Sequence, residues 1–139
     1  MKGLGSLIRL QNWKVDEKRR ELGVLEGKRS EFVTQGENLE IEMHQEQIVA
    51  VRDDMNDQYG LYAEQVIERR AKLSNSIAEL DKEIVVIHDQ LTILYQELKK
   101  FEISLERREK EAQIEEQRKT QIELDEMSIN MHKRAEKSA

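Results

Sequence analysis

The side chains of this sequence that could bind a metal or transfer a proton are histidines and carboxylates, because the chain contains no cysteine. Without cysteine, a disulfide framework and a thiolate zinc site are both excluded. Di-iron helical bundles carry a glutamate three residues before each ligating histidine, which places both ligands on one helix face. Here an aliphatic residue takes that place each time: Ile41 before His44, Val85 before His88 and Ile129 before His132. The sequence therefore predicts no metal centre of this kind.

Two short segments have the composition of ion-binding loops but not their spacing. Residues 53–60 read DDMNDQYG, and their glycine is misplaced for a calcium-binding EF-hand loop. Residues 3–6 (GLGS) are too short for a phosphate-binding loop, and no strand pattern precedes them. No nucleophile is paired with a base by spacing. We therefore expect a protein that is not an enzyme and that has no cofactor or bound metal.

The composition is that of long helices. Of 139 residues, 37% are charged and 4% are aromatic, and none is proline, which favours a coiled coil over a compact globular core. Residues 36–68 contain one basic and nine acidic side chains, so their net charge of −8 argues against nucleic acid as a partner. No apolar run is long enough to span a membrane, and the first twenty residues do not form a secretory signal.

A heptad pattern in the second half of the chain predicts a helix that packs on another helix. Between residues 73 and 105, every position reached by alternating steps of four and three is apolar, and most positions between are polar. The ten positions are Leu73, Ile77, Leu80, Ile84, Ile87, Leu91, Leu94, Leu98, Phe101 and Leu105. A weaker seam, interrupted by Gln11, Lys18, Arg29, Gly36 and Glu46, runs through the first third of the chain.

The predicted fold is all-α: a single coiled-coil domain, residues 1–139, in which two long helices form an antiparallel hairpin. We expect helix one over about 4–54, a turn at about 55–60, and helix two over about 61–135. Folding the chain about residue 58 makes partner numbers sum to 116, with Glu46 opposite Arg70 and Gly36 opposite Leu80. A slip of one heptad would also match apolar positions but would lose the Glu46–Arg70 pair. A parallel dimer of helix two is the other alternative.

In this register helix two is longer and overhangs helix one from residue 112. Apolar residues that the pairing of the two helices does not use then form two groups that a partner protein would cover, and two of them, Ile122 and Ile129, continue the seam beyond the end of helix one. One lies near the turn: Ile41, Ile48, Val51, Met55, Tyr59 and Tyr62. The other lies at the chain ends: Leu7, Leu10, Trp13, Ile122, Leu124, Met127, Ile129 and Met131. The alternative for both groups is scattered surface hydrophobes or local packing.

Three segments give the chain a family resemblance. Residues 6–10 (SLIRL), 15–23 (VDEKRRELG) and 59–62 (YGLY), together with the length and helix plan, resemble the FliJ family of flagellar export stalk proteins. The resemblance covers nearly the whole chain. It implies an antiparallel two-helix coiled coil that sits in the pore of the hexameric ATPase of the flagellar type III secretion system. It also implies a cytoplasmic protein, peripherally associated with the inner membrane at the flagellar base.

The resemblance implies partners and, by analogy with rotary shafts, places for the two apolar groups. The partners are the export ATPase hexamer, whose assembly and activity the family promotes, the membrane export gate and export chaperones. The chain-end group would contact the ATPase ring, and the near-turn group would contact the export gate. We expect a monomeric hairpin when the protein is free. The alternatives are a homo-oligomeric scaffold, a chaperone without ATPase coupling, and the equivalent stalk of a virulence injectisome.

Overall fold

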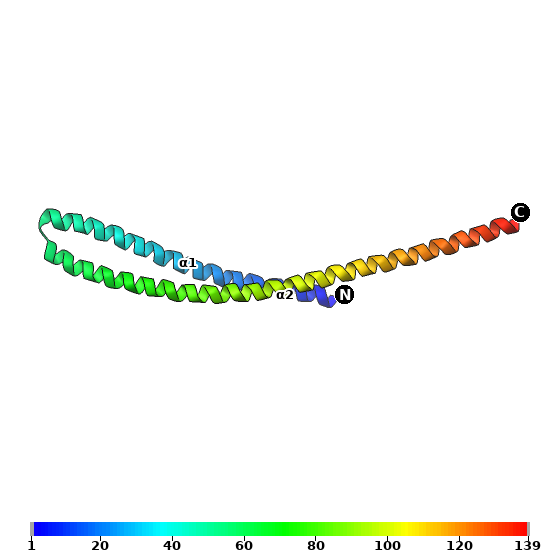
Figure 1. Cartoon of the computed structure of the whole chain (residues 1–139), viewed down its shortest axis with the longest axis horizontal. Coiled ribbons are helices and arrows are strands. Elements are labelled where there is room, and N and C mark those ends of the chain that lie inside the picture. Colours follow the sequence, from blue (N-terminus) through cyan, green and yellow to red (C-terminus); the bar gives the residue numbers. More distant parts are fainter. Residues whose placement is uncertain (1, 139) are drawn as a thin grey trace. The chain divides into compact units, whose positions relative to one another are not determined.

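The chain consists of two long helices joined by a tight turn. The computed structural model describes residues 2–138, in which α1 comprises Lys2–Asp53 and α2 comprises Asn56–Ser138 (Figure 1). No strand occurs in this described part of the chain, so the predicted all-α class is confirmed. The helices pack against each other in two compact units. Residues 12–95 form the hairpin unit, and residues up to 11 together with those from 96 onward form the chain-end unit.

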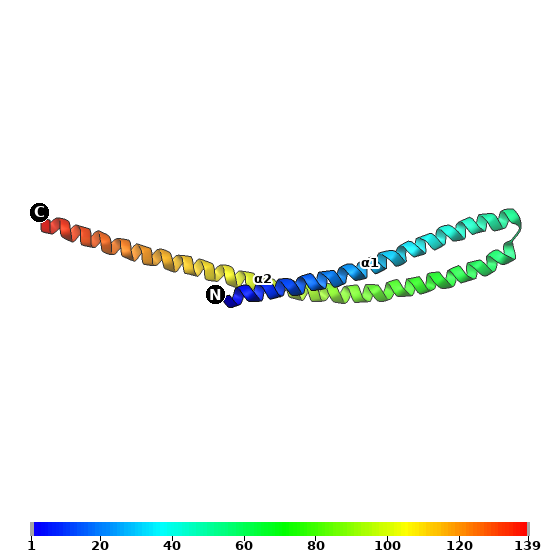
Figure 2. The ribbon, with the colours of Figure 1, turned by 180° about the vertical axis from the view of Figure 1, so that it is seen from behind.

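In the hairpin unit, α1 and α2 run side by side in opposite directions, as both views of the ribbon show (Figure 2). The heptad seam supplies the core of this unit. Val15, Ile87 and Leu91 are buried together, and three half-buried leucines pack against them: Leu22, Leu25 and Leu94. Each buried seam side chain contributes roughly 1.5–3 kcal/mol before conformational entropy is counted. A single apolar layer therefore holds the two helices together.

The helices are paired one heptad away from the expected register. Arg29 Nε lies 2.6 Å from Asp81 Oδ1, and Arg70 Nη2 lies 2.6 Å from Glu40 Oε1. In both pairs the arginine lies at a seam position and the carboxylate follows one, so the residue numbers of each pair sum to 110. Facing seam residues therefore sum to 109, seven less than the expected 116, and the predicted Glu46–Arg70 and Gly36–Leu80 pairs are wrong. Gly36 instead lines a groove with Leu73 and Ile77. Apolar positions still face apolar positions, because a slip of seven residues preserves the heptad.

The turn explains the slip. Asp54 adopts a left-handed conformation with φ of 57°, and the Met55 amide donates a 2.8 Å hydrogen bond to the Ala50 carbonyl. This is the Schellman arrangement that closes the end of a helix. The Met55 carbonyl then accepts the Tyr59 amide at 3.0 Å, which begins α2. The turn is therefore residues 54–55 and not the expected 55–60, and residues 56–60 belong to α2.

The start of α2 has no side-chain cap. The residue before the helix is Met55, which offers no side-chain oxygen. Asp57 lies in the first turn of α2, where a carboxylate is favoured by the helix dipole. The start of α2 is thus stabilised by charge, not by a side-chain cap.

The chain-end unit is packed where α1 begins. Leu4 is buried, and the amide of Gln11, only 3% exposed, donates from Nε2 to Glu97 Oε2 at 2.8 Å. Gln11 is one of the polar residues that interrupt the first seam. Its hydrogen bond satisfies the buried amide, and so the polar residue is accommodated in the seam.

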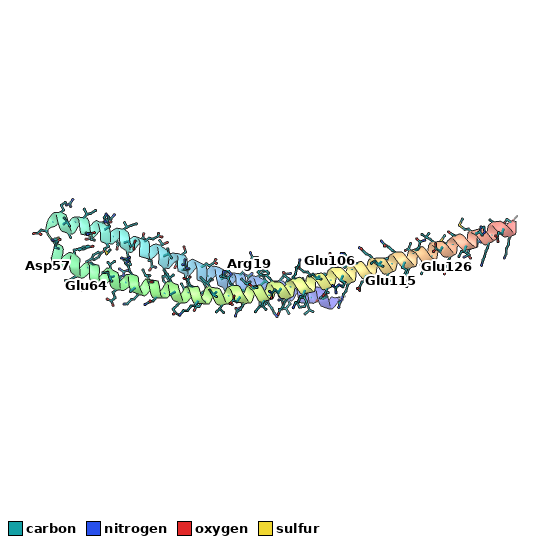
Figure 3. The ribbon with its side chains drawn as sticks, viewed as in Figure 1. Arg19, Asp57, Glu64, Glu106, Glu115 and Glu126 are labelled. Atoms are coloured by element: carbon teal, nitrogen blue, oxygen red, sulfur yellow. The ribbon has the colours of Figure 1, made fainter. Side chains whose placement is uncertain are left out.

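From residue 106 to residue 138, every described side chain of α2 is exposed. This stretch begins six residues earlier than the expected overhang at 112, close to the seven residues by which the register is shifted. Figure 3 shows its side chains standing outward along the helix. Pairs three or four residues apart join its turns: Lys110 with Glu106, Arg118 with Glu115 and His132 with Glu136. Each such pair contributes about 0.2–0.5 kcal/mol to a helix.

We predict that Asp54→Gly stabilises the protein by about 1 kcal/mol, because glycine adopts the left-handed conformation without the steric cost of a Cβ. The free energy of unfolding from urea titration measures this. Asp53→Gly is the matched control and should destabilise by about 1 kcal/mol, since Asp53 is helical. Destabilisation by Asp54→Gly would contradict the turn described above.

The register predicts which introduced cysteines cross-link. Gln35→Cys and Ser76→Cys lie about 3 Å apart along the hairpin axis in this register, whereas Gln35→Cys and Glu83→Cys lie about 14 Å apart. A short bismaleimide should therefore join the 35/76 pair several times faster than the 35/83 pair, as mass spectrometry would measure. The opposite order would support the register in which numbers sum to 116.

Candidate interaction surfaces

The residues that a metal centre or a membrane span would need are not assembled. Within residues 2–138, no three His, Asp or Glu side chains lie close enough together to hold a metal ion. Neither helix, over its described length, has an apolar stretch sufficient to cross a membrane. The features that remain are exposed apolar side chains and cavities between the helices, one of which lies beside the turn.

The predicted near-turn group divides in two. Ile41, Ile48 and Val51 are well exposed on α1, and we call them the outer row. Tyr59 and Tyr62 are half-buried and, with Met55, line a cavity between the helices. We expected all six residues to form one exposed group because residues 55–60 were assigned to the turn. In the structure the two tyrosines lie in the first turns of α2 and face α1 instead.

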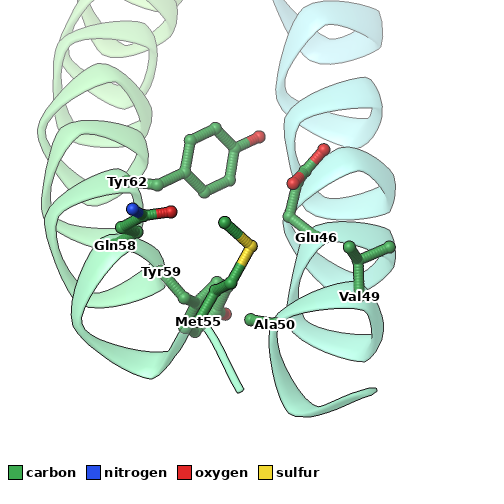
Figure 4. Close-up of a pocket in the computed structure, with 7 residues that line it drawn as sticks. All are labelled: Glu46, Val49, Ala50, Met55, Gln58, Tyr59 and Tyr62. Atoms are coloured by element: carbon green, nitrogen blue, oxygen red, sulfur yellow. The ribbon is translucent and has the colours of Figure 1, made fainter. Parts of the chain in front are cut away.

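We call this cavity the end cavity. It has a volume of about 130 Å³ and is lined by both helices and the turn: Glu46, Val49, Ala50, Met55, Gln58, Tyr59 and Tyr62 (Figure 4). The rings of Tyr59 and Tyr62 are tilted by 42°, with centroids 6.4 Å apart. Figure 4 shows Tyr62 and Glu46 facing each other from opposite helices. Ala50, a small residue at a seam position, leaves the space that a larger side chain would fill.

Negative charge surrounds the end cavity. Partial burial raises the pKa of the Tyr62 phenol above its ordinary value, and the carboxylates of Glu42 and Glu46 raise it further. Arg69 acts in the opposite direction. The phenol therefore keeps its proton at physiological pH and remains a hydrogen-bond donor beside two carboxylates.

In the chain-end unit, the predicted apolar residues of α2 are all exposed. Ile122 and Ile129 are seven residues apart and continue the seam, whereas a second row lies elsewhere on the helix: Leu124, Met127 and Met131. Met131 is 67% exposed. Apolar residues on two faces of a helix are typical of one that another protein encloses. We call residues 106–138 the free helix.

The N-terminal members of the predicted group are exposed as well. Leu7 and Leu10 belong to the chain-end unit, and both are about half exposed. Trp13 belongs to the hairpin unit and is 59% exposed. An exposed tryptophan is a common anchor in protein interfaces. The structure thus leaves each of the three residues accessible to a partner.

A further exposed set was missed by the sequence reasoning. Val85, Val86 and Ile93 lie on the outside of α2 in the hairpin unit, and all three are more than half exposed. The signal was present: Val85 and Val86 directly follow a seam position, and Ile93 is seven residues after Val86. These aliphatic residues lie at non-seam positions, which the heptad pattern does not identify.

These surfaces have the character of a protein that binds other proteins through helix faces. Exposed isoleucine, leucine and methionine along both helices supply apolar contact area, and the alternating charges between them supply solubility. Heptad patterns of this kind recur in many unrelated coiled coils, so they indicate a binding mode without indicating a family. Comparison with protein-family models, with curated proteins and with solved structures finds no significant match to the chain.

Proposed function

We propose that this chain is a non-enzymatic coiled-coil stalk of the flagellar type III protein export apparatus. In this role it binds the export ATPase ring, promotes its assembly and activity, and links it to the membrane export gate. Two arguments support the proposal: the resemblance of residues 6–10, 15–23 and 59–62 to the FliJ family, and the geometry of the free helix. The geometry of the free helix is a property of this chain and does not depend on the resemblance.

The main structural support for the proposal is the free helix. It has 33 residues, all exposed in the described structure, and so extends for about 50 Å with no buried side chain. Its apolar side chains lie in two rows, not one. A helix that pairs with one other helix needs a single row, whereas a helix inserted into a ring is contacted from several sides. The two rows therefore favour enclosure by a ring.

The outer row supports the second half of the proposal. Ile41, Ile48 and Val51 form an apolar strip on α1 within the strongly acidic part of the chain, residues 36–68. A strip of this kind suits a partner with apolar side chains flanked by basic ones. In the proposed role that partner is the export gate, which would hold the stalk on the cytoplasmic side of the inner membrane. Export chaperones are further candidates for this strip.

A homo-oligomeric scaffold is the second candidate, and one observation favours it. Ile122 and Ile129 continue the heptad seam along the free helix, where the same row of a second copy would match it. Light scattering distinguishes the two proposals, because the stalk is a monomer when free whereas the scaffold is a dimer or larger at micromolar concentration.

We predict that the full chain raises ATP turnover by the flagellar export ATPase and that a chain ending at Leu105 does not. Removing residues 106–139 deletes the free helix but leaves the buried residues of both units. Circular dichroism should show that the shortened chain remains helical. Full stimulation by the shortened chain would contradict a ring contact through the free helix.

A point variant tests the same contact without shortening the chain. Leu124→Gln with Met127→Gln should raise the concentration for half-maximal stimulation about a hundredfold, since each lost apolar contact is worth about 1.5 kcal/mol. Glutamine keeps good helix propensity. The matched control is Glu116→Gln with Lys119→Gln, which has the same spacing and leaves the net charge unchanged. Equal weakening by both variants would count against specific apolar contacts.

A further inference from the structure

The end cavity has properties that the stalk role does not use. It joins two aromatic rings from α2 to a carboxylate from α1, and Val49 and Ala50 are also among the residues that line it. Glu46 forms no ion pair with any Lys or Arg of the described chain, although Arg70 pairs with Glu40 along the same hairpin. An acidic side chain at the edge of an aromatic cavity is thus left without a cationic partner.

The charges around the cavity select a cation. Aromatic faces attract positive charge through their quadrupole, and the attraction is greater where water is partly excluded. The end of α1 is negative and the start of α2 is positive, and because they adjoin at the turn their effects offset each other. The carboxylates therefore determine that the electrostatic potential at the cavity is negative. The charges of Glu42 and Glu46 both raise the pKa of Tyr62, and residues 36–68 carry a net charge of −8.

The size and shape of the cavity favour a flat head group on a flexible stem. Its volume of about 130 Å³ is close to that of a protein cavity known to hold one benzene ring, about 150 Å³, so it has room for one small planar group. A guanidinium group is planar, stacks on aromatic rings and pairs with a carboxylate through two N–H donors. The Gln58 side-chain oxygen, at the cavity wall, is a further acceptor. These features match arginine better than the compact, strongly hydrated ammonium group of lysine.

We propose that the end cavity binds the side chain of an arginine from a partner protein, with the guanidinium stacked on Tyr62 and paired with Glu46. The partner segment then lies across the acidic end of the hairpin unit, where basic neighbours of that arginine meet the remaining carboxylates. The arginine gives this site a specificity that the apolar outer row lacks. Arg69, whose charge reaches Tyr62, is the chain's own competitor for the site.

The test is an NMR titration of the full chain with the peptide acetyl-Gly-Arg-Gly-amide. Shifts should be confined to the backbone amides of residues 46–62 and the rings of Tyr59 and Tyr62. The neutral analogue with citrulline in place of arginine should produce no shifts, and the lysine peptide should bind several times more weakly. No ATPase is present in this experiment, so its outcome is separate from that of the stalk proposal.

Variants assign the binding to the cavity. Glu46→Gln should weaken the arginine peptide up to about fivefold, the value of a partly exposed ion pair. Tyr62→Leu should weaken it about two- to fivefold by removing the aromatic face. Glu64→Gln is the matched control, since it removes one exposed charge of the same acidic region outside the cavity, and it should change affinity less than twofold.

Three results would overturn the proposal. Equal shifts with arginine and citrulline would show that charge is not recognised, and equal affinity for arginine and lysine would remove the argument for a guanidinium. Equal weakening by Glu46→Gln and Glu64→Gln would show general attraction to the acidic surface. An improvement in affinity with Arg69→Gln would support the site, because it removes the competing cation.

Discussion

The conformation of Asp54 is the constraint on which the rest of the hairpin unit depends. Its left-handed backbone allows the Met55 amide to donate a hydrogen bond to the Ala50 carbonyl, which ends α1. Only two residues, 54 and 55, separate α1 from α2. A turn this short fixes which residues of the two helices lie at the same level. The register of the seam follows from it, and so does the residue at which α2 leaves its partner.

Two features of the molecule are consequences of that register. Ala50 and Tyr59 lie at the same level beside the turn, and the small side chain opposite the large one leaves the end cavity open. At the other end, α1 covers α2 only as far as residue 105, so that the 33 residues beyond it are exposed. A turn three to four residues further along the chain would shift the register by one heptad and shorten the free helix. The same backbone conformation therefore shapes both candidate surfaces.

The helices and their antiparallel pairing could be predicted from the sequence because the heptad of residues 73–105 is almost uninterrupted. The register could not, because apolar matching repeats every seven residues and a surface ion pair such as Glu46–Arg70 is too weak to choose between repeats. The turn selects the register, because Asp54 adopts the left-handed conformation at a position where glycine is the usual residue. The predicted exposure of Ile41, Ile48 and the free-helix residues held, whereas Tyr59 and Tyr62 turned inward because they lie inside α2. No side chain of residues 106–138 is buried, so the free helix relies on helix propensity and on ion pairs between its own turns, and its local stability should be low until a partner covers it.

Amide hydrogen exchange of the isolated chain, repeated with the export ATPase, tests whether residues 106–138 are a partner-binding helix. We expect rapid exchange from residue 106 onward and slow exchange in the core around Val15 and Leu91 when the chain is alone. We also expect strong protection of residues 106–138 when the ATPase is added. Slow exchange of residues 106–138 in the isolated chain at micromolar concentration, or no change on adding the ATPase, would show that this stretch is not the partner-binding helix.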